Sequence, residues 1–369
     1  MSISRLMQMG AAGAGGPGKY LLDNSTNGKL LIYEITNTTP VYVSTIEDSG
    51  VSIGSVQDVK YDADAAIFYI LSDNPDRFSA WDVSDFSNPT KLNDINVGAT
   101  TNTGNGISLL YGVPLGSGSG NAAICTINNN VVSVDITNPS SLVLRDTRSI
   151  SSPGYGSEGG TVDLGITSSG SPIIGVQEDS VLRQIRVSSI SDISSVSTTI
   201  DTSRLLVTTA ARPLRVDRAN SFVLVSSRST TYSLTTWSYT YGSFLLASTS
   251  SLGLINASDW SLEDRKIFAC DNSNLYARNV STSGVLTNSG TSLSDSRFDS
   301  TEALAYDYDA QIVYTTKQVS SEERNIYLWD VSNTSSMSFS GAYNVYPDVG
   351  GSVSALQFTR IIYEGVSNN

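Results

Sequence analysis

Paired carboxylates are the residues of this chain whose types and spacing are best suited to chemistry. Two carboxylates roughly 5–10 Å apart can cleave a glycosidic bond, and clustered carboxylate oxygens can bind Ca²⁺. Aspartate in a tight turn instead accepts hydrogen bonds from nearby backbone amides. No complete D-x-D-x-D-G loop is present, so we expect turn residues here, with no catalytic residue and no metal site. The pairs are Asp62/Asp64, Glu263/Asp264 and Asp307/Asp309.

The chain contains no histidine, which removes Ser-His-Asp and Cys-His catalysis and imidazole metal sites. A catalytic base would have to be Lys, Asp or Glu. The two cysteines, Cys125 and Cys270, lie in apolar segments, and we expect buried free thiols. Gly13, Gly15 and Gly18 match a dinucleotide fingerprint in letters, but no strand precedes them and Pro17 interrupts them. No cofactor is therefore expected.

The net charge of −13 disfavours nucleic acid as a partner, because binding to nucleic acid depends on Lys and Arg at the phosphates. The same charge disfavours an anionic membrane surface. No run of 18 apolar residues is present, so no membrane insertion is expected.

An alternating apolar segment that ends on Asp and a β-branched residue recurs along the chain, and a fixed period indicates a repeat architecture. Examples are 78–89, 132–139 and 326–333. Recurrence in several repeats favours a structural role for the aspartates Asp82, Asp135 and Asp330. The residues that close the segments, at intervals of 43–53, are Ile35, Val83, Ile136, Val187, Trp237, Val280 and Val331.

Each of the seven repeats shows four short strands, of which the second is a continuous apolar run such as 66–71 or 222–225. The first repeat lacks its first strand, and residues 353–358 supply a spare one. We therefore expect an all-β fold: a seven-bladed β-propeller with four antiparallel strands per blade, closed by the C-terminal strand joining the N-terminal blade. Residues 19–369 would form the propeller and residues 1–18 a separate Gly/Ala-rich attachment peptide.

The repeat resembles the LVIVD family, whose blades read Val-Asp-Val/Ile-Ser-Asp/Asn followed by proline. Residues 81–85 and 134–139 carry the closest match, and 235–238 depart from it. The resemblance implies a propeller with an interaction or surface role, and it implies no active site.

The opening peptide, residues 1–16, resembles the N-terminal peptide of virion and tail-fibre-type proteins of marine tailed bacteriophages. That resemblance implies an attachment peptide that docks to other virion proteins, with Ile3, Leu6, Met7 and Met9 as its apolar contacts. A leader without a role is the alternative. Localisation in the virion, as an extracellular phage particle carrying multiple copies, follows from the same resemblance.

Loops that do not recur are the candidate binding surface of such a propeller. We expect a non-enzymatic virion structural protein, a tail or fibre adhesin or a capsid decoration, that binds a host-surface glycan or protein. A glycan-degrading enzyme with paired carboxylates in the channel is the alternative, and a cellular surface-interaction module is a third reading. The candidate loop residues are Asp73, Arg77, Tyr155, Phe298, Lys317, Glu322, Glu323, Arg324 and Tyr346.

Overall fold

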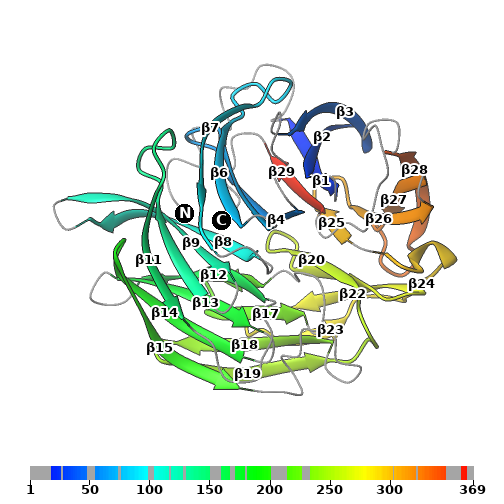
Figure 1. Ribbon diagram of the computed structural model, residues 1–369. Helices are drawn as coiled ribbons and strands as arrows, with labels where there is room; N and C mark the ends of the chain where they lie inside the picture. Colours follow the sequence, from blue (N-terminus) through cyan, green and yellow to red (C-terminus); the bar gives the residue numbers. More distant parts are fainter. Residues whose placement is uncertain are drawn as a thin grey trace, which may run out of the picture.

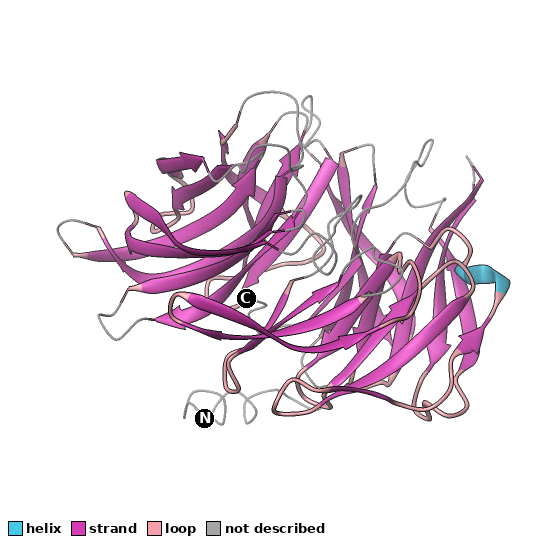
Figure 2. Cartoon of the chain, turned by 90° about the horizontal axis from the view of Figure 1, so that it is seen from below, coloured by secondary structure: helices cyan, strands magenta, loops and turns pink. Residues whose placement is uncertain are grey.

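In the computed structural model the described residues form seven antiparallel sheets around a common centre (Figure 1). The first strands of neighbouring blades lie against one another at that centre, and the later strands extend outwards. Helix is almost absent from this part of the chain, apart from the 3-10 turn η1 (Ser296–Phe298) (Figure 2). The described residues are 18–25, 28–47, 55–73, 76–98, 104–115, 118–127, 130–149, 159–166, 171–178, 181–200, 214–226, 233–301, 303–320, 323–345 and 359–363.

The seven-bladed propeller predicted from the repeat is confirmed. In six blades the four main strands follow in sequence order from the centre outwards, and in blade 1 the C-terminal strand β29 takes the innermost place. Blade 6 carries one additional short strand, which pairs with its third strand. The strands are, in blade 1, β29 (Thr359–Tyr363), β1 (Lys19–Ser25), β2 (Lys29–Thr36) and β3 (Thr39–Ile46); in blade 2, β4 (Ser55–Asp62), β5 (Ile67–Asp73), β6 (Arg77–Asp82) and β7 (Thr90–Asn96); in blade 3, β8 (Gly104–Pro114), β9 (Ser119–Ile127), β10 (Asn130–Asp135) and β11 (Val143–Ser149); in blade 4, β12 (Gly159–Ile166), β13 (Pro172–Glu178), β14 (Val181–Ser189) and β15 (Asp192–Ile200); in blade 5, β16 (Arg215–Asp217), β17 (Phe222–Ser226), β18 (Leu234–Thr240) and β19 (Ser243–Ser250); in blade 6, β20 (Ala257–Ser261), β21 (Lys266–Cys270), β22 (Asn274–Val280), β23 (Leu286–Asn288) and β24 (Leu293–Ser294); in blade 7, β25 (Ala303–Asp307), β26 (Ile312–Ser320), β27 (Glu323–Asp330) and β28 (Ser338–Asn344).

The core consists of apolar clusters that each join two neighbouring blades. One cluster packs Leu21 and Tyr33 of blade 1 against Tyr314 and Ile326 of blade 7, so the first and last blades are in contact like any other pair. Fully burying one such aliphatic side chain contributes about 1.5–3 kcal/mol. The second strands are buried on both faces, which explains their continuous apolar sequences.

The residues that close the repeats hold the same backbone hydrogen bond in several blades. The amide of Val83 donates to the carbonyl of Ala66, just before the second strand, at 2.9 Å. Ile136, Val280 and Val331 make the equivalent bond at the same distance. In blade 5 the residue in this position is Tyr239 and not Trp237, so that sequence assignment was wrong by two residues.

The closing strand is Thr359–Tyr363, which pairs antiparallel with β1 and completes blade 1. The sequence placed this strand at 353–358, and those residues lie outside the described part of the chain. The principle of closure is unchanged, because a C-terminal strand still covers the inner edge of the N-terminal blade. An ion pair between Lys19 and Asp307, with Nζ–Oδ1 at 3.1 Å, connects blade 1 to blade 7 beside it.

Cys125 and Cys270 are buried free thiols, as predicted. Burial, and then the charge of Asp58, raise the pKa of the Cys125 thiol. No helix in the described ranges is long and apolar enough to span a membrane.

Candidate functional site

The candidate loop residues Lys317, Glu323 and Arg324 do not form one exposed surface. Arg324 is fully buried, and its guanidinium faces the buried carboxylate of Asp23 in blade 1, with Nε–Oδ2 at 3.6 Å. Glu323 is exposed at the start of β27 and accepts a hydrogen bond from Asn325. Lys317 is half-buried in β26. The prediction of Arg324 as a surface binding residue is therefore wrong, because its charge lies inside the junction that closes the ring.

Two further loop candidates lie at the turn between β5 and β6. Arg77 forms an ion pair with Asp94 of β7, which ties the third strand of blade 2 to its outer strand. Asp73 is the last residue of β5. Arg77 therefore has a structural partner within its own blade.

The candidate loop residue Phe298 is fully buried and stacks on Trp329, with ring centroids 4.2 Å apart. It is not open to a ligand, so that prediction was wrong. Tyr155, Glu322, Tyr346 and the peptide contacts Ile3, Leu6, Met7 and Met9 lie outside the described residues.

Two of the carboxylate pairs act as turn residues, as expected. Oδ1 of Asp62 accepts the amides of Asp64 and Ala65 at 3.1 and 3.2 Å. Oδ1 of Asp307 makes the equivalent bonds at the same hairpin of blade 7, both at 3.1 Å. This role recurs because every blade must turn between its first two strands.

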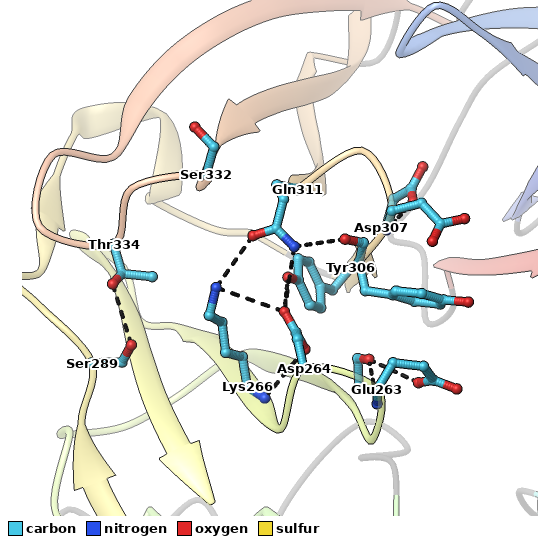
Figure 3. A network of polar contacts seen from close by, with 12 residues as sticks. Glu263, Asp264, Lys266, Ser289, Tyr306, Asp307, Gln311, Ser332 and Thr334 are labelled. Atoms are coloured by element: carbon cyan, nitrogen blue, oxygen red, sulfur yellow. Dashed lines mark hydrogen bonds and ion pairs between the residues drawn. The ribbon is translucent and has the colours of Figure 1, made fainter.

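The third pair belongs to a polar network between blades 6 and 7 (Figure 3). Asp264 accepts the hydroxyl of Tyr306 and faces the ammonium of Lys266 at 3.7 Å. Lys266 also donates to Oε1 of Gln311 at 3.2 Å. Glu263 is engaged separately, with Ser261. Both carboxylates are thus used in structural contacts.

A different set of charged residues lies on the innermost strand of blade 2. Asp58, Lys60 and Asp62 alternate along β4 and therefore share one face of the strand. Lys60 pairs in register with Tyr69, whose ring packs in the cluster between blades 2 and 3, so this face is directed at blade 3. The three residues are only 5–7% exposed, although Asp and Lys are almost never buried without partners.

The first strand of blade 3 bridges this set at both ends. Oδ2 of Asp58 accepts the amide of Ile107 in β8 at 2.9 Å, and Oδ1 accepts its neighbour Val59 at 2.9 Å. Tyr111 of β8 lies within interaction distance of the Asp62 carboxylate. The pairing register of β8 and β9 shifts between Leu110 and Val113, so Tyr111 lies in a β-bulge. A bulge changes the direction in which a side chain points. Lys60 lies between the two bridges.

Tyr69 and Tyr111, which lie beside these charged residues, remain protonated across the neutral range. Burial, and next the charge of Asp62, raise the pKa of Tyr111 far above its ordinary value. Burial, followed by Asp62, likewise raises the pKa of Tyr69. Tyr111 is nevertheless 45% exposed, so part of the residue stays accessible to a ligand.

The combination of a lysine between two aspartates on β4 is not repeated on the first strands of blades 5, 6 and 7. The position of Lys60, two residues before the hairpin residue, holds Arg215 in blade 5, Asp259 in blade 6 and Ala305 in blade 7. A carboxylate beside an ammonium can remove a proton from water and stabilise a developing oxyanion. Among the described residues, no group of three or more His, Cys, Asp or Glu could hold a metal ion.

Sequence reasoning missed Asp58, Lys60 and Tyr111. A signal for two of them was present, because the Asp-x-Lys-x-Asp pattern at 58–62 has the two-residue period that places all three charges on one strand face. The bulge that presents Tyr111 has no such signal in the sequence.

Comparison with known proteins shows the fold. No family model matches the chain and no curated protein matches it. The periplasmic gluconolactonase of Pseudomonas aeruginosa superposes with a TM-score of 0.68 at 11% identity, covering 94% of this chain and 99% of that one. A 6-phosphogluconolactonase-like protein of Bacteroides fragilis gives 0.65 at 10% identity, covering 95% and 99%. A protein of Lactobacillus plantarum gives 0.64 at 13%, covering 94% and 99%.

These comparisons correct the functional prediction. The expectation of a non-enzymatic bacteriophage structural protein is contradicted, because propellers described as gluconolactonases are among the similar structures and nothing supports a phage origin. The LVIVD resemblance is not shown, and only its coarser content, a propeller, is confirmed. At this identity the likeness establishes the fold alone, so an activity for this chain needs its own argument.

Proposed function

We propose that this protein is a hydrolase of sugar-derived lactones, with its reaction at the inner wall between blades 2 and 3. The observation that carries the proposal is Lys60, buried at 6% exposure on the innermost strand between two carboxylates on the same face. The gluconolactonases of the same fold support the substrate class. The reaction needs no histidine, which this chain lacks.

The spacing along β4 favours an ester over a glycosidic bond. Asp58 and Asp62 are four residues apart on one strand, which separates their Cα atoms by about 13 Å. Glycosidases place their two carboxyl groups roughly 5–9.5 Å apart. Lactone hydrolysis needs one base and one group that stabilises the oxyanion, and Asp58 and Lys60 are neighbours on the same face.

The roles follow from the chemistry of each group. The carboxylate of Asp58 takes a proton from water as the water oxygen bonds to the lactone carbonyl carbon. The ammonium of Lys60 stabilises the negative charge that develops on the carbonyl oxygen. The ring C–O bond then breaks, and the proton held by Asp58 passes to the leaving oxygen, giving a hydroxy acid. Tyr111, kept protonated beside Asp62, offers its ring edge and hydroxyl to the substrate.

The test is hydrolysis of glucono-1,5-lactone by Asp58→Asn and Lys60→Met variants. We expect kcat to fall roughly 10²–10⁴-fold without the base and roughly 10²–10³-fold without the ammonium. Asp146→Asn is the matched control, because Asp146 on the outer strand β11 also accepts two backbone amides, that of its neighbour Thr147 and that of Ile193 in the next blade.

The control separates catalysis from stability. Each Asp→Asn change replaces one of two accepting oxygens with an NH2 group, so both variants should lose one backbone hydrogen bond and similar thermal stability. Asp146→Asn should keep its kcat. Equal kcat values for Asp58→Asn and Asp146→Asn, with both proteins folded, would remove the proposed site.

A further inference from the structure

We infer that Arg215 of blade 5 recognises an anionic group, a carboxylate or a phosphate, on the ligand of the central channel. This inference rests on the proposed function and adds that a charged sugar derivative binds more tightly than a neutral one. Arg215 holds the register position of Lys60, three blades further round the seven-bladed ring.

The contacts of Arg215 place its guanidinium at the inner edge of blade 6, towards the centre of the ring. Arg215 pairs in register with Leu224, which packs between blades 5 and 6, so the side chain leaves β16 towards blade 6. Its Nη2 is 3.1 Å from Oδ1 of Asp259. Asp259 pairs with Phe268, which packs between blades 6 and 7, so Asp259 leaves β20 on the opposite face.

The ion pair must therefore pass around one edge of β20. One edge of β20 pairs with β21, so the ion pair passes around the other edge, which faces the centre of the ring. Asp259 is itself fixed, because its two oxygens accept the amides of Trp260 at 2.9 Å and Tyr306 at 3.1 Å. Arg215 is consequently held in place by a carboxylate that cannot readily turn away.

Much of the guanidinium is left for a ligand. Arginine has five N–H donors, and within the described residues the contact of Nη2 with Asp259 is the one polar contact of the Arg215 side chain. The side chain is 25% exposed. The remaining donors form the planar fork that binds carboxylate or phosphate in a bidentate manner.

Two other arginines at blade junctions show what a purely structural contact looks like. Arg218 gives Nε to the carbonyl of Asp163 and Nη2 to its carboxylate, at 2.9 and 2.6 Å. Arg265 uses Nε, Nη1 and Nη2 on three oxygens of blades 5 and 6. Arg215 differs from both, because a single nitrogen is engaged.

The negative net charge of the protein gives the positive charge of Arg215 a specific use. At a net charge of −13 the long-range field repels anions, so an anionic ligand needs local cations to hold it. Lys60 and Arg215 supply such charges at the same level of the inner wall.

The experiment measures product-like ligands by isothermal titration calorimetry. Gluconate carries only a carboxylate, glucitol 6-phosphate only a phosphate, and glucitol neither. We expect Arg215→Gln to weaken binding of the anion that Arg215 recognises by about tenfold or more, and to leave glucitol unchanged. Arg215→Lys should recover part of the lost affinity. The control variant Arg218→Gln, which changes an arginine with a structural contact, should bind as the wild type does.

The outcomes separate the possibilities. A loss for gluconate assigns Arg215 to a carboxylate, a loss for glucitol 6-phosphate assigns it to a phosphate, and equal affinity of wild type and Arg215→Gln for both overturns the inference. Absence of anion binding by the wild type also overturns it. Because binding is measured without turnover, Arg215-dependent binding in a protein that hydrolyses no lactone would refute the proposed function alone.

Discussion

At the scale of single residues, recurrence separates structural carboxylates from candidate catalytic ones. Asp82, Asp135 and Asp330 each accept the backbone amide of the residue two positions on, at 2.8–3.0 Å. This confirms the structural role that their recurrence indicated. Asp58 also holds backbone amides, but the lysine beside it has no counterpart in blades 5–7, where that position carries arginine, aspartate or alanine.

The structural role of Asp82 has a consequence at acidic pH. The hydrogen bond from the backbone amide of Ser84, and then that from its side chain, lower the pKa of Asp82 below its ordinary value of 3.8. Because the folded pKa is depressed, this contribution to stability is present above about pH 4 and is lost as the pH falls through the folded pKa.

We predict that Asp82→Ala lowers the free energy of unfolding at pH 7 by about 0.5–1.5 kcal/mol, with lactone hydrolysis unchanged. Asp82→Asn keeps an acceptor but cannot titrate, so its stability should fall less steeply than that of the wild type below pH 4. Urea unfolding monitored at pH 7 and pH 3 measures both effects. Parallel acid profiles for the wild type and Asp82→Asn would contradict this account of the turn.

At the scale of elements, the sequence was sufficient to predict the four strands of a blade and their order. Continuous apolar runs marked the second strands because these are buried on both faces. The closing strand was misplaced because 353–358 and 359–363 both have β-forming sequences, and only the pairing with β1 decides between them. Likewise, Trp237 and Tyr239 differ by one strand period, so pattern alone could not choose the anchor of blade 5.

The junction of blades 6 and 7 illustrates how closely neighbouring blades approach. Gly290 adopts a φ of +85°, and a Cβ atom there would lie 2.1 Å from the carbonyl oxygen of Thr334. Ser289 and Thr291 on either side bond to blade 7 at Thr334 and Ser335. Glycine is thus required by the contact as well as by the backbone conformation.

Gly242 supplies a matched control for this contact, because it has the same φ of +85° but open space around its Cβ position. Both Gly→Ala variants bear the strain of a left-handed residue, about 1 kcal/mol. We predict that Gly290→Ala loses about 1–3 kcal/mol more than Gly242→Ala, because the blades must also move apart. Thermal unfolding of the two variants measures the difference, and equal losses would show that the junction is looser than described.

At the scale of the whole molecule, the ring was predictable and the function was not. Seven repeats and a spare strand indicate a closed propeller, whereas one fold can host many unrelated functions. Lys60 of β4 and Arg215 of β16 come from strands that are far apart in sequence. Their common register position on the innermost strands follows from the folded ring, which no local pattern reveals.

The most direct measurement is proton release from glucono-1,5-lactone by the wild-type protein, followed in a pH-stat at constant pH. Hydrolysis of each lactone yields one acid, so catalysis appears as base consumption above the spontaneous rate. The account predicts an enhanced rate that saturates with substrate and falls roughly 10²–10³-fold when Lys60 is replaced by Met. A rate equal to that of heat-denatured protein at every lactone concentration would contradict it.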